Sequence, residues 1–123
     1  MRILSQSEQL VQNIIFEDMI FNVSKGHNGK AVHIEVRAKS AASYTEVQGY
    51  RIENISFKNI MINGSTSNMI ESLIKCGVED SPRSGISNIR FENFKISDKE
   101  IAPDDILKIG NVSNINFLRE KEN

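Results

Sequence analysis

The sequence predicts an all-β fold in which short parallel strands stack as about three to four coils of a solenoid. One pattern occurs three times in full and once in part, starting at Val11, Ile52, Ile86 and Val112. Its β-branched and aromatic residues recur at period two, which is typical of strands. Unequal distances between the copies (41, 34 and 26 residues) indicate constant strands with variable loops. The alternative is an ordinary β-sandwich in which the motif arose by accident.

Each copy is anchored by an asparagine and by a phenylalanine three residues later. The asparagines are Asn13, Asn54, Asn88 and Asn114, and the phenylalanines are Phe16, Phe57, Phe91 and Phe117. Asparagine tolerates the left-handed backbone region and hydrogen-bonds locally, so it suits a tight corner between strands. We therefore expect the asparagines to stack as amide ladders and the phenylalanines to stack inside.

The chain is expected to start with a polar segment, residues 1–10, that leads in to the repeats or caps them. A short helical turn is one option there. The repeats span residues 11–117, and Asp18 is predicted to bend the first copy a second time. Met19 and Phe21 then begin another inward-facing stretch.

Residues 31–37, AVHIEVR, form the clearest alternating strand of the sequence. Val32, Ile34 and Val36 are predicted to point to one side, and His33, Glu35 and Arg37 to the other. The polar side is interpreted either as a rim that contacts an anionic sugar, with Arg37 pairing a carboxylate, or as a solvated strand face. We name His33, Glu35 and Arg37 as the candidate substrate-binding residues.

Two later segments are expected to occupy the place of residues 31–37 in their own coils. Ile70 is placed on the same rung as Ala31, although a helix over Met69–Lys75 is an alternative. A strand that begins at Ile106 is also placed on this rung, because Ile106 follows Asn88 by as many residues as Ala31 follows Asn13. The intervening residues 97–105 are predicted to be a loop, and residues 118–123 a frayed tail.

Composition excludes several classes of function. The 123 residues suit one domain, and the net charge of −1 gives no reason to expect a nucleic-acid partner. No apolar run reaches the roughly 20 residues of a membrane span. The N-terminus lacks the apolar core of a signal peptide, so the chain as written is expected to be soluble and not exported; the compartment is otherwise left open. No cofactor or metal site is predicted, because His27 and His33 lack clear carboxylate partners.

The repeat NIxFxNI, followed by a Gly/Asn turn and a strand such as AVHIEVR, resembles the C-terminal coils of glycoside hydrolase family 28. This polygalacturonase-like family belongs to the pectin-lyase-like superfamily. The resemblance covers about residues 11–117. It implies a right-handed, single-stranded parallel β-helix and an activity on pectin-type polyuronides, in proteins that are commonly secreted or periplasmic.

The catalytic signature of that family, N-T-D, D-D, G-H-G and R-I-K in chain order, is not present here. Asp104-Asp105, Gly26-His27-Asn28 and His33-Ile34-Glu35 match parts of it only superficially, and we interpret all three as coincidence. Glu35 and Glu71 are predicted to lie about 5 Å apart on neighbouring coils, either as a retaining pair or as two solvated glutamates. No catalytic residue is assigned, and whether the chain is an enzyme is left open.

Three functions follow as hypotheses. The chain is the C-terminal part of a polygalacturonase-like glycosidase, inactive without its catalytic coils, or a non-catalytic structural or carbohydrate-binding module, or a decayed gene product. The first coil, with Val11, Ile14 and Phe16, is expected to present an open edge. This edge predicts marginal stability, self-association through the N-terminal coil, or capping by residues 1–10.

Overall fold

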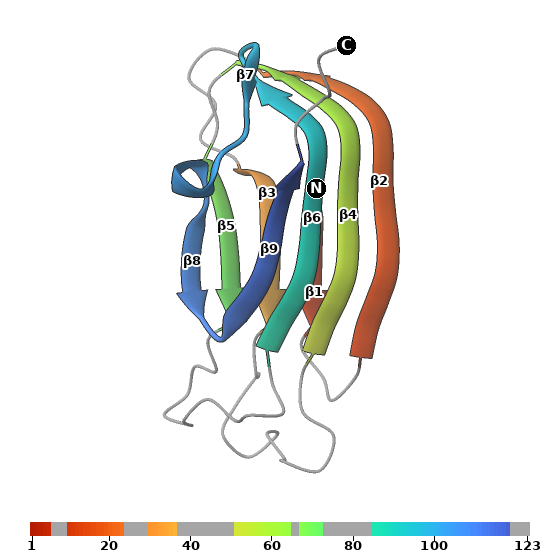
Figure 1. Ribbon diagram of the computed structural model, residues 1–123, viewed down its shortest axis with the longest axis vertical. Helices are drawn as coiled ribbons and strands as arrows, with labels where there is room; N and C mark the ends of the chain where they lie inside the picture. The colour runs from red at the N-terminus through yellow and green to blue at the C-terminus, as the bar shows by residue number, and fades with distance from the viewer. Residues whose placement is uncertain (6–9, 24–29, 37–50, 65–66, 73–84, 119–123) are drawn as a thin grey trace.

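The computed structural model describes residues 1–5, 10–23, 30–36, 51–64, 67–72 and 85–118, of which 67–72 are described by their backbone only. These residues form strands, apart from turns and one short 3₁₀ helix, Pro103–Asp105. The described part is therefore all-β, as predicted (Figure 1).

The strands form two parallel sheets that the chain visits in turn (Figure 1). The short sheet contains, in spatial order, β1 (Arg2–Ser5), β3 (Lys30–Val36), β5 (Ser67–Ser72) and β8 (Leu107–Gly110). The long sheet contains β2 (Leu10–Asn22), β4 (Arg51–Asn63), β6 (Gly85–Ile96) and β9 (Val112–Leu118), with β7 (Lys99–Glu100) added antiparallel to β6.

The four copies of the repeat lie side by side in the long sheet, in the register that the repeat predicts. Phe16 pairs with Phe57, Phe57 with Phe91, and Phe91 with Phe117. The isoleucine that follows each asparagine aligns in the same way. Equivalent side chains therefore form ladders that run across the sheet, perpendicular to the strands.

The first three copies bend at two residues whose backbone lies in the left-handed region, and the described part of the fourth bends at one. The φ angles are positive at Asn13, Asn54, Asn88 and Asn114, and again at Asp18, Asn59 and Asn93. Such a residue adds one position to the alternation of the strand, so that inward-facing residues on either side of it are three apart rather than two. This is why Ile52 and Ile55, and then Phe57 and Ile60, are all buried. The predicted bends at the asparagines and at Asp18 are confirmed.

The core lies between the two sheets and consists of the inward ladders. Val32, Ile34 and Val36 of β3 are fully buried, and Phe57 and Phe91 are 1% exposed. Their rings stack with centroids 5.0 Å apart. Phe94 meets both rings edge-on. This arrangement adds the favourable geometry of aromatic pairs to the burial of their area.

Several local expectations were wrong. Arg2–Ser5, in the segment for which a helical turn was considered, is strand β1 and pairs with β3. The rung assigned to Ile70 is shifted, because Ile70 pairs with Ile34 rather than with Ala31. The helix alternative fails over Ser67–Ser72, which is strand β5. Ile106 precedes β8 instead of starting it.

The expected loop of residues 97–105 contains further structure. Ser97 and Asp98 both have positive φ and turn the chain back as strand β7. A two-residue hairpin with a type I′ turn needs this conformation at both central positions. The N–H of Ile101 then donates to the carbonyl of Phe94 at 2.8 Å, which ties the returning chain to β6.

The long sheet ends in an outer strand on each side. At one side, β2 pairs with β4 alone in the described part of the chain. Val11, Ile14, Phe16 and Met19 are only half-buried there, and Phe21 is 38% exposed. At the other side, β9 pairs with β6 alone among the described residues, and its inward-facing residues are likewise half-buried. The part of β6 beyond β9 is covered by β7, Ile101 and Ile106, the last two being 4% exposed.

Candidate functional site

The candidate residues on the outer side of β3 are not equally accessible. Glu35 is 1% exposed, and the side chain of His33 is 20% exposed. Arg37 lies outside the described residues. The interpretation of this side as a solvated face is therefore wrong for Glu35, because its carboxylate is buried.

The carboxylate of Glu35 lies close to two basic side chains, those of Arg2 and His33. Arg2 Nη2 donates to Glu35 Oε2 at 3.5 Å, and His33 Nε2 lies 3.4 Å from the same oxygen. Arg2 itself is 55% exposed and stands opposite His33 on β1. A buried carboxylate is costly without such partners, so the cluster compensates a charge inside the fold. Sequence reasoning missed Arg2 because residues 1–10 carry no strand pattern.

Glu35 and Glu71 lie opposite each other in the register of β3 and β5, as predicted. A pair of carboxylates works as a retaining glycosidase only when both flank an open sugar site. Glu35 does not meet that condition, because its side chain is buried. The geometry of Glu35 is that of a structural ion cluster.

Asp104 and Asp105 lie exposed in the 3₁₀ helix Pro103–Asp105. Asp105 Oδ2 accepts a hydrogen bond from the N–H of Ala102 at 2.9 Å. Its role in the fold is therefore to cap this turn.

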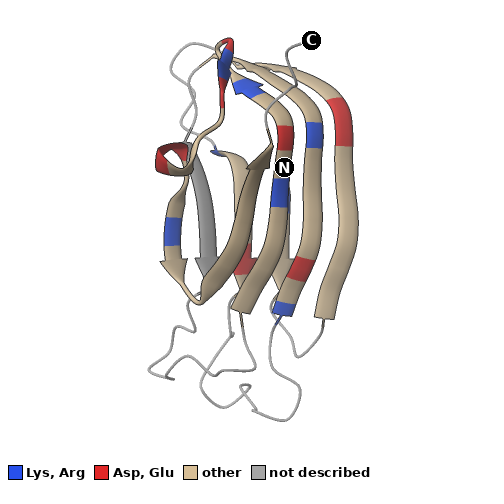
Figure 2. Cartoon of the chain, in the orientation of Figure 1, with Lys and Arg blue, Asp and Glu red and all other residues tan. Residues whose placement is uncertain are grey.

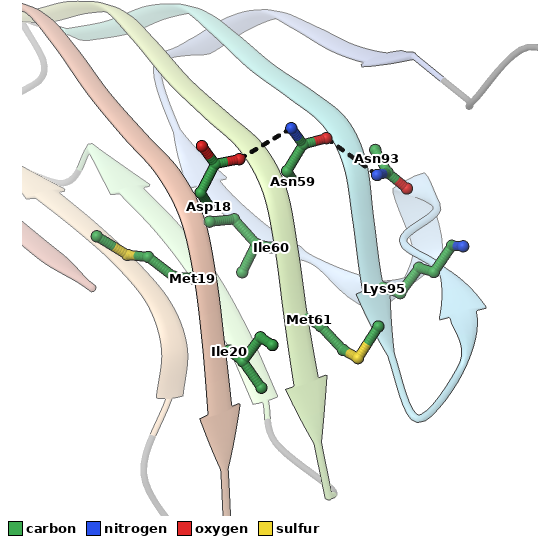
Figure 3. Close-up of a pocket in the computed structure, with 8 residues that line it drawn as sticks. All are labelled: Asp18, Met19, Ile20, Asn59, Ile60, Met61, Asn93 and Lys95. Carbon is green, nitrogen blue, oxygen red and sulfur yellow. Dashed lines mark hydrogen bonds between the residues drawn. The ribbon is translucent and has the colours of Figure 1, made fainter.

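A row of three polar side chains crosses the long sheet at its second bend (Figure 3). Asn59 Nδ2 donates to Asp18 Oδ1 at 3.0 Å, and Asn93 Nδ2 donates to Asn59 Oδ1 at 3.0 Å. Asn93 Oδ1 is buried and accepts no hydrogen bond from the described residues. The row borders a shallow depression of about 300 Å³ that Ile20, Met61 and Lys95 line with it.

A second depression, of about 400 Å³, lies on the outer face of the long sheet between the two bends. Its polar lining residues are Glu17, Ser56, Lys58, Arg90 and Glu92. We call it the outer groove. Glu17 pairs with Lys58, and Lys58 with Glu92, so that charge alternates across the strands (Figure 2). Alternation of this kind supports strand pairing.

The outer groove offers hydrogen bonds rather than acid–base chemistry. Lys58 lies between Glu17 and Glu92 in the register, so the two carboxylates do not face each other across an empty site. Lys58 and Arg90 are exposed on adjacent strands. Both can bind an anionic group from solvent, and Arg90 can do so with two parallel hydrogen bonds.

Within the described ranges, no three His, Cys, Asp or Glu side chains gather in a way that would hold a metal ion. The same residues include no helix with the length and apolar character needed to cross a membrane. No protein-family model, curated protein or solved structure matches this chain. Its function therefore has to be inferred from its own residues.

Proposed function

We propose that the two sheets belong to a right-handed, single-stranded parallel β-helix of about three to four coils. The proposal is supported by the alternation of the chain between two parallel sheets and by the in-register stacking of the repeat. Right-handed crossovers between parallel strands account for about 98% of such connections, which favours this hand.

We further propose that this β-helix is the C-terminal portion of a polygalacturonase-like glycoside hydrolase that acts on pectin-type polyuronides. The observation that carries this is the open edge of β2, which pairs with β4 alone in the described part of the chain and leaves Val11, Ile14 and Phe16 half-buried. An intact solenoid caps its ends, so an open β2 side favours further coils there. The catalytic residues would lie in those coils, and this chain alone would be inactive.

The contribution proposed for this chain is contact with the polysaccharide. Lys58 and Arg90 in the outer groove are the described cations on adjacent strands that suit successive uronate carboxylates. Arg90 stands opposite Ser56, and Lys58 opposite Glu92, so the two cations lie diagonally across β4 and β6, about 7–8 Å apart. A polyuronide running along that diagonal could place one carboxylate against each cation.

The test is affinity electrophoresis through gels that contain polygalacturonate or a neutral glucan. We expect polygalacturonate alone to retard the chain, and the double variant Lys58→Gln/Arg90→Gln to lose at least half of that retardation. Lys108→Gln is the matched control, because Lys108 is exposed on β8 of the other sheet. Equal retardation of the two variants, or equal retardation in both gels, contradicts the proposal.

Release of reducing ends from polygalacturonate tests the enzymatic part. The proposal expects none from the purified chain. Hydrolysis that is lost in Asp104→Asn and Asp105→Asn would assign the chemistry to this chain instead.

The second candidate function is a non-catalytic structural or carbohydrate-binding β-helix module. It is favoured because two carboxylates that were considered for catalysis have structural roles. Glu35 is buried, and Asp105 caps a turn. Retardation by polygalacturonate identifies a polyuronide-binding module or portion. No retardation by either polysaccharide, together with stable self-assembly, identifies a structural module.

A further inference from the structure

We propose that the open edge of β2 is a docking surface for one further parallel strand that carries the same repeat and a hydrogen-bond donor opposite Asp18. The inference rests on the β-helix part of the proposed function and not on the identity of any polysaccharide. It names the chemistry of the partner strand, which the open edge alone does not specify.

The side-chain ladders have one direction. Asn54 donates its amide to Asn13 at 3.2 Å, and Asn63 donates to Asn22 at 2.9 Å. Asn59 likewise donates to Asp18. Each amide thus points its NH₂ group toward the β2 side of the sheet. A strand added on that side would accept hydrogen bonds from the side-chain amides of β2, in the same direction as the existing ones.

Asp18 interrupts this rule at the edge. Asn13 and Asn22 keep an NH₂ group for the next strand, because β4 has already used their oxygens. An ionised Asp18 carboxylate has no donor at all. The edge therefore presents a donor, an acceptor and a donor in that order along β2. A matching strand carries acceptors at its two outer ladder positions and a donor, such as Asn, Lys or Arg, at the middle one.

The apolar residues of β2 fit the same occupant. Their equivalents in β4, which has a strand on both sides, are at most 1% exposed, namely Ile52, Ile55, Phe57, Ile60 and Ile62. The β2 residues at these places are half-buried, or 38% exposed for Phe21. The difference is the surface that one added strand would cover, continuing ladders that already join β2 to β4.

A parallel strand fits this edge and an antiparallel one does not. The bends of β2 lie at Asn13 and Asp18. A second copy of β2 that ran antiparallel with its bends matched to these would place Ile14 opposite Glu17 and Phe16 opposite Ile15. Inward-facing residues would then meet outward-facing ones, which breaks every apolar ladder. A two-fold dimer through β2 is therefore disfavoured, and a parallel strand with the same bend spacing is favoured.

The experiment appends one more coil to the full chain, as a duplicate of residues 30–66 placed before Met1. Linking the coil covalently keeps its effective concentration high, so weak docking is still detected. Three versions differ at the duplicate of Asn59, the position that would face Asp18, and carry Asn, Lys or Asp there. Amide hydrogen exchange of β2 and the thermal midpoint are measured for each.

We expect the Asn and Lys versions to slow exchange of the β2 amides at least tenfold and to raise the midpoint over the unextended chain. The Asp version should protect β2 less, because two carboxylates would face each other. Adding Asp18→Asn to the Asp version should restore the protection of β2, since the amide that it introduces can donate to the added carboxylate. That bond would run in the same direction as the native one from Asn59 to Asp18. Circular dichroism of Asp18→Asn without the duplicate checks that this variant folds.

Unprotected β2 amides in all three versions overturn the proposal, and so does equal protection by all three. Protection that depends on protein concentration would instead indicate self-association through this edge and also overturns it. The polygalacturonate retardation of the same proteins separates the two ideas. If β2 is protected but polygalacturonate does not retard the protein, the docking proposal stands and the proposed substrate class is contradicted. If polygalacturonate retards the protein but β2 is not protected, the substrate class stands and the docking proposal is contradicted.

Discussion

Phe57 and Phe91, from two different copies of the repeat, stack with their ring planes within 9° of parallel. Both lie in a continuous row that begins at Phe16 and ends at Phe117. The row shows how the repeat is used: an identical residue at an identical offset meets its own kind on the next strand. Stability should therefore be concentrated in the interior ladders.

Phe57→Ala should lower the free energy of unfolding by about 3–5 kcal/mol, because the ring is 1% exposed and the vacated volume cannot collapse fully. Urea unfolding measures this. Phe117→Ala, at the half-buried end of the row, is the matched control and should cost clearly less. A loss below about 1 kcal/mol for Phe57→Ala would mean that the core register is wrong.

Asn59→Ala should destabilise the chain by about 1–3 kcal/mol, because it removes two ladder hydrogen bonds and places a Cβ-bearing residue without local hydrogen bonds at φ 55°. Asn59→Gly should cost less, since glycine adopts this conformation freely. Thermal unfolding of both variants, with Lys108→Ala at an exposed position of β8 as the control, measures the difference. If Gly costs more than Ala, backbone conformation is not what selects Asn at the bend.

Ile106→Ala should cost about 2–5 kcal/mol, because Ile106 is 4% exposed and belongs to the core. Its neighbour Leu107 is 55% exposed, so Leu107→Ala should change the stability by less than about 0.5 kcal/mol. Chemical denaturation compares the two. Equal effects would show that Ile106 is not part of the core.

Arg2→Ala should destabilise the chain by roughly 1 kcal/mol, because it removes a charged partner from the buried Glu35. The effect should largely disappear in a Glu35→Gln background, where there is no charge left to compensate. A double-mutant cycle by urea unfolding isolates the coupling. Additive losses would place the stabilising partners of Glu35 elsewhere.

Stability should rise with pH as the α-amino group of Met1 titrates. Burial lowers the pKa of this group below its ordinary value of 8.0. Between the lowered folded-state pKa and 8.0, the unfolded chain binds more protons than the folded one, so the free energy of unfolding increases with pH there and levels off above 8.0. Thermal midpoints across this range measure the rise. Acetylation of the amine should abolish it, and a rise that persists after acetylation must come from another group.

Much of the long sheet could be predicted because its information is local and repeated. The offsets of Asn54 and Phe57 recur at Asn88 and Phe91, so the strands align wherever the copies align. The bends follow from the tolerance of asparagine for positive φ. Less of the candidate site could be predicted. The prediction that Glu35 and Glu71 lie opposite each other is confirmed, but alternation along β3 does not reveal that its polar side is covered at Glu35.

The sequence by itself determined the repeat, the register of the long sheet and the asparagine bends, because a fixed pattern of side chains can satisfy only one alignment of neighbouring strands. The tertiary structure decided what depends on single, unrepeated contacts. These are the pairing of β1 with β3, the pairing of β7 with β6 beside the buried Ile106, and the burial of Glu35 against Arg2 and His33. Each joins residues that share no motif, so only their meeting in space gives them a role.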